Sequence, residues 1–338
     1  MPTIKFTDAT FFDGETSTIE DRLSDFLKMY RNRKMGLGLT GSANGRPEIA
    51  RLELDTFGDG VMMGVSLTTA DSKKIRRRAA LLVQRRNAMS GLAHLKPDEI
   101  KRLSVLKNGA RLTSPGNEAW ADELAAALHS EMPWMGPATE AAWHALRRSS
   151  HRGDAGLRLP PMILNGPAGI GKSVWARRLA ELCAVPACVV EVGSGSAGFR
   201  IAGLERGWSS AGPGRPLETI LQTGIANPMM IVDEICKMQT HTSEKGQVLQ
   251  MATTMLALLE PATNKSWECP FYRVKFDMSH VSWVMTANNA ERVPLPLLNR
   301  CTVIDLQRIG LLDLCTFARA ETARRGLSDA SGEAIVEQ

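Results

Sequence analysis

The sequence has few of the features that mark secreted, zinc-binding or membrane proteins. Its six cysteines are scattered without a C-x-x-C pair, and its six histidines show no ligand spacing. This pattern argues against a disulfide framework or a zinc site and favours reduced thiols. The opening residues, MPTIKFTDATFF, lack the basic start and apolar run of a signal peptide. No run approaches the ~18 apolar residues of a membrane span. We therefore expect a cytoplasmic protein with no membrane partner.

Residues 166–173 read GPAGIGKS and match the phosphate-binding loop pattern G-x-x-x-x-G-K-[ST] at every fixed position. The glycines let the backbone curl so that its amides point at a polyphosphate. Lys172 can then reach the β- and γ-phosphates, and the Ser173 hydroxyl can bind Mg²⁺. An apolar run at 161–165 predicts a strand before the loop, and 174–182 predicts a helix after it. The alternative is a glycine-rich turn. The residues predicted to bind ATP are Gly166, Pro167, Ala168, Gly169, Ile170, Gly171, Lys172 and Ser173.

A second apolar run, at 228–234, ends in Asp233 and Glu234. Continuous apolar runs are typical of strands that are buried on both faces, and ligands bind at the carboxyl ends of such strands. We expect Asp233 to hold the magnesium through water and Glu234 to polarise the attacking water. The alternative is that both acids only cap the next helix.

Two further residues follow predicted strands. Asn288 comes after the run 281–286, where its amide can orient the lytic water, although asparagine also favours plain turns. Arg300 precedes the run 301–305 and can act as an arginine finger, which stabilises charge on the transferring phosphoryl group. The alternative for Arg300 is an ordinary surface arginine.

These motifs, in this order, resemble those of AAA+ ATPases, and within that family most closely the ATPase module of Lon proteases. The resemblance runs from about Pro160 to Leu306. It extends between the motifs, through RIAGLERGWSSAGPGRPLETILQTGIANPMMIVDEICKM, ALLEPATNKSW and VKFDMSHVSWVMTANNAERVPLPLLNRCTVIDL. It implies an α/β fold, the AAA+ P-loop NTPase three-layer sandwich with a parallel sheet. A mainly helical N-terminal region would precede this sandwich, and a truncated helical lid would follow it.

The resemblance also implies roles for individual residues. The phosphate loop becomes Walker A, the two acids become Walker B, and Asn288 becomes sensor 1. Arg300 would act across a subunit boundary, which implies a homo-oligomeric ring, usually of six. Trp208, shortly before Pro213 and Gly214, resembles the pore-loop aromatic that grips translocating polypeptide. The alternative is that Trp208 folds back onto the core.

The chain departs from Lon proteases in two respects. No Ser-Lys peptidase domain follows Arg300, so the expected activity is ATP hydrolysis and not proteolysis. The lid is incomplete: 311–325 resembles its first helix, and 329–337 resembles the start of the second. The sensor 2 arginine is expected to be missing, which puts lid-coupled hydrolysis in doubt. A nucleotide-binding remnant without turnover is a third, weaker reading.

The predicted division of the chain is a basic, partly helical region at 1–118, a helical linker at 119–158, the ATPase core at 159–308 and a partial lid at 309–338. From Asp71 to Arg111 there are 12 lysines and arginines against 3 acidic residues. Such a run can contact phosphates of nucleic acid. It is more often a solvated face, and aromatic residues for base stacking are absent. Protein remodelling is therefore the first reading and a nucleic-acid-associated ATPase is the alternative.

Overall fold

The structure is a computed structural model that describes residues 1–12, 16–34, 66–192, 197–207, 211–239, 247–324 and 326. It divides into two compact units, one formed by Thr10–His94 and the other by Met1–Ala9 with Leu95–Gln338. Trp208 and the predicted second lid helix at 329–337 lie outside the described residues. The domain boundaries drawn from the sequence remain a prediction.

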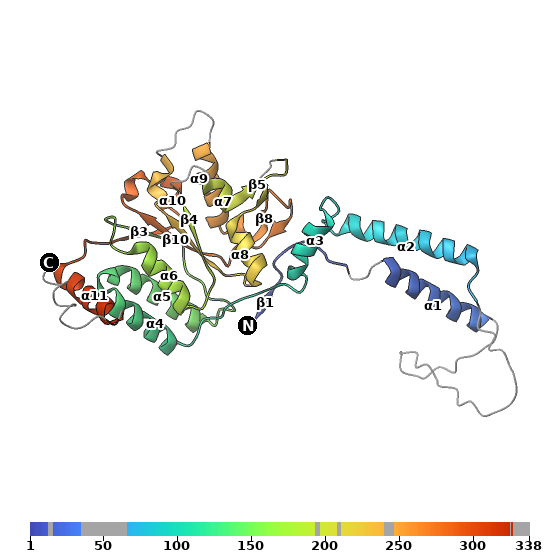
Figure 1. Cartoon of the computed structure of the whole chain (residues 1–338), viewed down its shortest axis with the longest axis horizontal. Coiled ribbons are helices and arrows are strands. Elements are labelled where there is room, and N and C mark those ends of the chain that lie inside the picture. The colour runs from blue at the N-terminus through green and yellow to red at the C-terminus, as the bar shows by residue number, and fades with distance from the viewer. Residues whose placement is uncertain are drawn as a thin grey trace, which may run out of the picture. The chain divides into compact units, whose positions relative to one another are not determined.

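The smaller unit contains two packed helices, α1 (Thr16–Lys34) and α2 (Thr69–Met89) (Figure 1). α2 begins at a capping box, in which Thr68 Oγ1 accepts from the Asp71 amide and the Asp71 carboxylate accepts from the Thr68 amide. Arg31 of α1 donates two hydrogen bonds of 2.8 Å to the same carboxylate. One acidic side chain therefore both caps α2 and ties it to α1.

Within the described residues, the larger unit begins with three α-helices, two short 3₁₀ helices and two short strands, and from there strands and helices largely alternate. Its first elements are β1 (Thr3–Ile4), α3 (Pro97–Leu103), η1 (Ser104–Leu106), β2 (Ala110–Arg111), α4 (Glu118–Glu131), η2 (Pro133–Met135) and α5 (Gly136–Arg152). Next come β3 (Met162–Asn165), α6 (Lys172–Leu182), β4 (Ala187–Glu191), α7 (Ala197–Ala202), β5 (Gly203–Leu204), β6 (Gly212–Pro213), α8 (Arg215–Thr223), β7 (Met229–Asp233) and η3 (Ile235–Gln239). The last are α9 (Gln247–Leu259), η4 (Asn264–Ser266), β8 (Trp267–Glu268), β9 (Lys275–Phe276), β10 (Ser282–Ala287), η5 (Ala290–Arg292), α10 (Leu295–Leu298), β11 (Thr302–Asp305) and α11 (Leu311–Arg324).

A five-stranded parallel sheet in the order β11-β3-β10-β7-β4 forms the centre of this unit (Figure 1). Its register brings the ends of β3, β10 and β11 level, because Asn165 is paired with both Ala287 and Asp305. All five strands run the same way, so the residues that follow them gather at one edge. This edge carries the candidate site.

Helices cover both faces of the sheet. On one face α4, α5 and α6 pack in a single hydrophobic cluster with Met229 and Ile231 of β7 and Val284 of β10. Residues that alternate with these, such as Met230 and Trp283, are buried on the other face, where α7, α8 and α9 lie. Both faces of β3, β7 and β10 are thus buried, as their continuous apolar sequences predict, whereas the outer strands β4 and β11 have exposed residues.

The predicted fold class is confirmed: the unit is α/β, with a parallel sheet and helices of the P-loop NTPase type. The four strands expected from the sequence lie within one residue of their predicted ends, and α11 ends one residue before the predicted lid helix. β4 and α9 were not predicted. No helix in the described part of the chain is both long enough and apolar enough to cross a membrane.

Candidate nucleotide-binding site

The loop at 166–171 connects β3 to α6 in a curled conformation that depends on glycine. Gly169 and Gly171 have φ angles of 83° and 88°, which residues with a Cβ atom rarely adopt. A Cβ on Gly166 would lie 2.6 Å from the Leu306 carbonyl oxygen. A Cβ on Gly169, by contrast, would have no heavy atom within 4 Å. The loop therefore packs tightly against the core at Gly166 and is open to a ligand at Gly169.

Lys172 is the first residue of α6, and its side chain lies beneath the loop. Its ammonium donates to the carbonyl oxygens of Gly166 and Pro167, at 2.6 and 2.7 Å, and to Asn288 Oδ1 at 3.0 Å. Burial lowers the pKa of Lys172, and the nearby Asp233 and Glu234 oppose that shift. The structure thus joins the loop lysine to the amide that follows β10.

Ser173 and Asp233 face each other across the ends of α6 and β7. Ser173 Oγ donates to Asp233 Oδ1 at 2.5 Å, and Thr286 Oγ1 donates to the same oxygen at 3.2 Å. Thr286 also accepts a 3.0 Å hydrogen bond from the Glu234 amide. Sequence reasoning missed Thr286, which lies inside an apolar run that was read only as a strand.

Glu234 follows β7 in a left-handed conformation, with a φ angle of 60°. This conformation is costly for a residue other than glycine, and such residues are concentrated at functional sites. The Glu234 carboxylate lies 2.6 Å from the Lys237 ammonium and raises the pKa of that lysine. The turn directs Glu234 away from the line of the strand, and the Thr286 hydroxyl holds its amide.

Arg300 lies apart from these residues. It precedes β11, and β11 begins level with the start of β3 because Thr302 pairs with Met162. The phosphate loop follows the other end of β3, roughly 10 Å away at ~3.3 Å per residue. Arg300 Nε donates to Glu260 Oε2 at 2.6 Å, and Nη1 donates to the Pro296 carbonyl at 3.0 Å. The structure does not bring Arg300 to the loop of its own chain.

Comparison with known proteins agrees with this geometry. Residues 162–308 match the model of the ATPase family associated with various cellular activities (AAA). Those residues form an AAA ATPase domain. The domain is similar to Lon proteases: 32% identity over 176 residues to the Lon protease of Mycoplasma pneumoniae, covering 52% of this chain and 21% of that protein. The mitochondrial Lon protease homolog of Phaeodactylum tricornutum is 32% identical over 168 residues, 50% of this chain and 18% of that protein. The chain therefore spans about a fifth of the length of these relatives.

Outside the AAA domain, Trp134 contacts the phosphate loop. Its indole nitrogen donates to the Ile170 carbonyl at 2.8 Å, and its ring meets Phe317 of α11 edge-on, with the centroids 5.7 Å apart. The sequence showed Trp134 only as part of a stretch between two predicted helices. It is a partly buried aromatic surface beside the loop of the AAA domain.

The chemistry of the AAA domain's donor set fits magnesium. Ser173 and Asp233 offer a hydroxyl and a carboxylate oxygen, which are hard ligands that Mg²⁺ prefers, and the ion commonly takes its other ligands from substrate phosphates and water. No cluster of three or more histidines, cysteines or acids suited to a metal occurs among the described residues.

Proposed function

We propose that this chain binds ATP with Mg²⁺ and hydrolyses it in its AAA domain. One observation carries the proposal: the hydroxyl of Ser173 lies 2.5 Å from the Asp233 carboxylate, directly beside the loop that Lys172 closes. Two segments far apart in sequence, 166–173 and the end of β7, thus supply a phosphate loop, a cation and two magnesium ligands at one edge of the sheet. AAA domains imply nucleotide binding, and the similarity to Lon proteases supports ATPase activity.

The remaining residues of the site take the roles that their positions allow. Bound Mg²⁺ would neutralise charge on the phosphates. Glu234 polarises the attacking water, because its carboxylate is exposed beside the proposed magnesium ligands. Asn288 accepts a hydrogen bond from Lys172 in this structure. Once Lys172 binds phosphate, the Asn288 amide can turn toward the γ-phosphate or the attacking water. Trp134 offers a flat surface near the loop on which a nucleotide base can pack.

We further propose that the active form is a ring of identical chains. Arg300 is on the opposite edge of the sheet from its own phosphate loop, so it can serve only the nucleotide of a neighbouring chain. Contacts that are repeated head to tail form a ring when the rotation between neighbouring chains closes. The similarity to relatives named Lon protease supports protein remodelling as the process that ATP hydrolysis drives. Trp208 is the residue proposed to contact the translocating polypeptide. The proposed enzymatic activity is ATP hydrolysis and not proteolysis, and the proposed location is the cytoplasm.

A nucleic-acid-associated ATPase stays the second candidate. α2 carries seven lysines and arginines against one acid, Asp71, and Asp71 is already bonded to Arg31. This surplus of positive charge suits contact with phosphates. Stimulation of ATP turnover by DNA, and not by unfolded polypeptide, would favour this candidate.

Two variants test the hydrolysis proposal. Lys172→Ala should abolish ATP binding, because it removes the cation that reaches the phosphates. Glu234→Gln should bind ATP as tightly as the wild type and lose turnover, because only activation of water is removed. Binding by fluorescent nucleotide and phosphate release should be measured on the same preparations. Wild-type turnover in Glu234→Gln would refute the assignment of that residue.

A further inference from the structure

Asn165 lies at the point where β3 enters the phosphate loop. It is the last residue of β3, and in the sheet it is paired with Ala287 of β10 on one side and with Asp305 of β11 on the other. The next residue, Gly166, donates its amide to the Ala287 carbonyl at 3.1 Å. Asn165 is therefore directly beside the proposed nucleotide site, between the ends of two neighbouring strands.

The side chain of Asn165 forms one hydrogen bond toward each of these strand ends. Its Oδ1 accepts from the Ala290 amide at 2.9 Å, and its Nδ2 donates to Asp305 Oδ1 at 2.7 Å. Ala290 begins η5, two residues after Asn288. A backbone amide can only donate and an ionised carboxylate can only accept. The two partners together therefore fix which way the Asn165 amide points.

Two side chains around the phosphate loop bond to the segment that follows β10. Lys172 donates to Asn288 Oδ1 at 3.0 Å, and Asn165 accepts from the Ala290 amide. On the proposed roles, Lys172 leaves Asn288 for the phosphates when the nucleotide binds. The hydrogen bond between Asn165 and Ala290 can remain in place at that stage. Asn165 would then hold the segment that carries Asn288 against β3.

The position of Asn288 depends on the residues on either side of it. Asn288 is exposed and follows the last residue of β10, so the ladder of the sheet does not hold it. Its nearest anchors are Ala287 in the sheet and Ala290, which is bonded to Asn165. A misplacement of about 1 Å in a group that contacts the reacting atoms can lower the rate about 100-fold. One hydrogen bond at Ala290 can thus have a large effect on turnover.

We propose that Asn165 and Asp305 are positioning residues for ATP hydrolysis. Asp305 orients the Asn165 amide, and Asn165 holds Ala290 so that Asn288 meets the γ-phosphate or the attacking water. This role rests on the proposed function, because Asn165 acts through Asn288 and not through its own contact with the nucleotide. Exchanging the donor and the acceptor between positions 165 and 305 should preserve the role, whereas changing Asn165 alone should not.

Three variants test this exchange with almost no change of shape. Asn165→Asp can still accept from Ala290, but it replaces the 2.7 Å hydrogen bond to Asp305 with a contact between two carboxylates. Like charges this close repel, so the side chain should turn away and release Ala290. Adding Asp305→Asn to the same chain supplies an amide that donates to the new carboxylate. Asp305→Asn alone keeps an acceptor for Asn165 and should lower kcat by less than Asn165→Asp does.

The measurements on the full chain are kcat for ATP, the Kd of ADP, and hydrogen exchange of the Ala290 amide without nucleotide. ADP lacks the γ-phosphate, so misplacement of Asn288 should not weaken its binding. We expect Asn165→Asp to lower kcat at least about tenfold, to change the Kd of ADP less than about twofold, and to speed exchange at Ala290 about tenfold. In the double variant, kcat and the exchange rate should return to within about threefold of the wild type.

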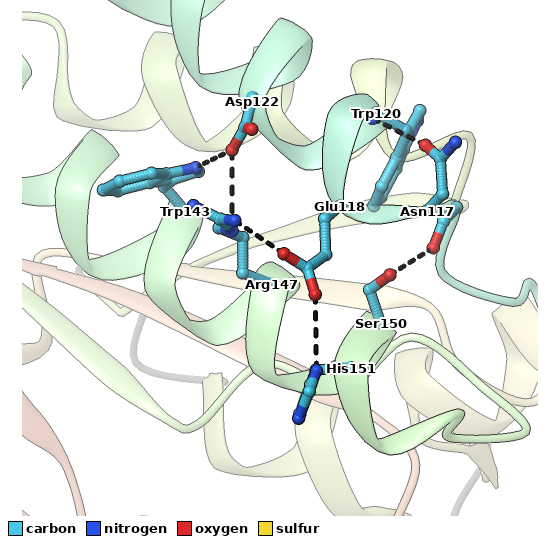
Figure 2. A network of polar contacts seen from close by, with 9 residues as sticks. Asn117, Glu118, Trp120, Asp122, Trp143, Arg147, Ser150 and His151 are labelled. Carbon is cyan, nitrogen blue, oxygen red and sulfur yellow. Dashed lines mark hydrogen bonds and ion pairs between the residues drawn. The ribbon is translucent and has the colours of Figure 1, made fainter.

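A matched control lies outside the AAA domain, in the network of polar contacts that Figure 2 shows between α4 and α5. There the Asp122 carboxylate accepts from the Trp143 indole nitrogen at 2.6 Å. Asp122→Asn makes the same chemical change as Asp305→Asn at another side-chain hydrogen bond. It should leave kcat and exchange at Ala290 unchanged.

Three outcomes would overturn the proposal: wild-type kcat in Asn165→Asp, no recovery in the double variant, or a loss of ADP affinity as large as the loss of kcat. The last would indicate general damage to the phosphate loop. Failure of the proposed function is distinguishable from these. A wild-type chain without turnover would refute ATP hydrolysis, while exchange at Ala290 would still decide whether Asn165 and Asp305 hold the segment after β10. Equal exchange in the wild type and Asn165→Asp would refute that as well.

Discussion

Thr286 gives the sharpest prediction about the AAA domain, because its side chain bonds to both of the proposed Walker B residues, Asp233 and Glu234. Its hydroxyl donates to Asp233 and accepts from the amide of Glu234. Thr286→Val keeps the shape of the side chain and removes both bonds. The Glu234 amide then loses its acceptor, at a cost of about 1–3 kcal/mol for a buried unsatisfied group. Glu234 has an unfavourable φ angle of 60°. Without the bond from its amide to Thr286, we expect Glu234 to leave this position.

Loss of the residues that orient metal ligands reduces activity about 10–100-fold. We expect Thr286→Val to lower kcat for ATP by about this factor, and to lower Tm by roughly 2–10 °C. Steady-state phosphate release and a thermal melt measure the two effects. Thr286→Ser restores the hydroxyl and should recover most of kcat. Thr219→Val, which removes a similar hydroxyl from the surface of α8, should leave kcat unchanged. Wild-type kcat in Thr286→Val, or equal loss in Thr286→Ser, would refute the reasoning.

Three further predictions concern assembly, substrate and stability. Mixing Arg300→Ala chains with Glu234→Gln chains should restore some ATP turnover, because some interfaces then pair an intact finger with an intact Walker B site; full turnover by a monomer would contradict this. Trp208→Ala should abolish stimulation of turnover by an unfolded polypeptide and leave Tm nearly unchanged, whereas a Tm lower by many degrees would indicate a buried tryptophan. Arg31 holds the pKa of Asp71 below its ordinary value of 3.8, so the unfolded carboxyl binds a proton first as pH falls. The stabilisation of α1 and α2 should therefore be complete above about pH 4 and decline as pH falls below it, measured by hydrogen-exchange protection, and Asp71→Asn should remove this pH dependence.

The strands and the phosphate loop could be predicted because their signals are local. An apolar run followed by glycines or acids needs only a few consecutive residues, and parallel strands bring such ends together whatever the details of packing. β4 was within reach of the same reasoning, because 185–190 is an apolar run that ends in two β-branched valines. β4 was not predicted, because no recognised motif follows it.

The contacts that Thr286 and Trp134 make could not be predicted in the same way. Thr286 becomes important only through the register of β10 with β7, which brings its hydroxyl to residues 52 and 53 positions earlier. Trp134 reaches Ile170 across 36 positions because η2 packs beside the loop. Neither residue belongs to a motif, and neither contact has a local sequence signal.

The ion pair between Arg300 and Glu260 bears on the proposed role of Arg300 as an arginine finger for a neighbouring chain. Both side chains are more than a third exposed, at 36% and 37%, and such surface ion pairs contribute about 0–1 kcal/mol. A hydrogen bond to a charged phosphate contributes more, about 1.5–3 kcal/mol. Arg300 can therefore leave Glu260 for the phosphate of an adjacent chain at little cost, while the pair keeps its side chain ordered until then. On the proposed roles, a single chain carries a finger and a phosphate loop on opposite edges of one sheet, so a complete site needs two chains. Turnover that depends on protein concentration follows from this separation.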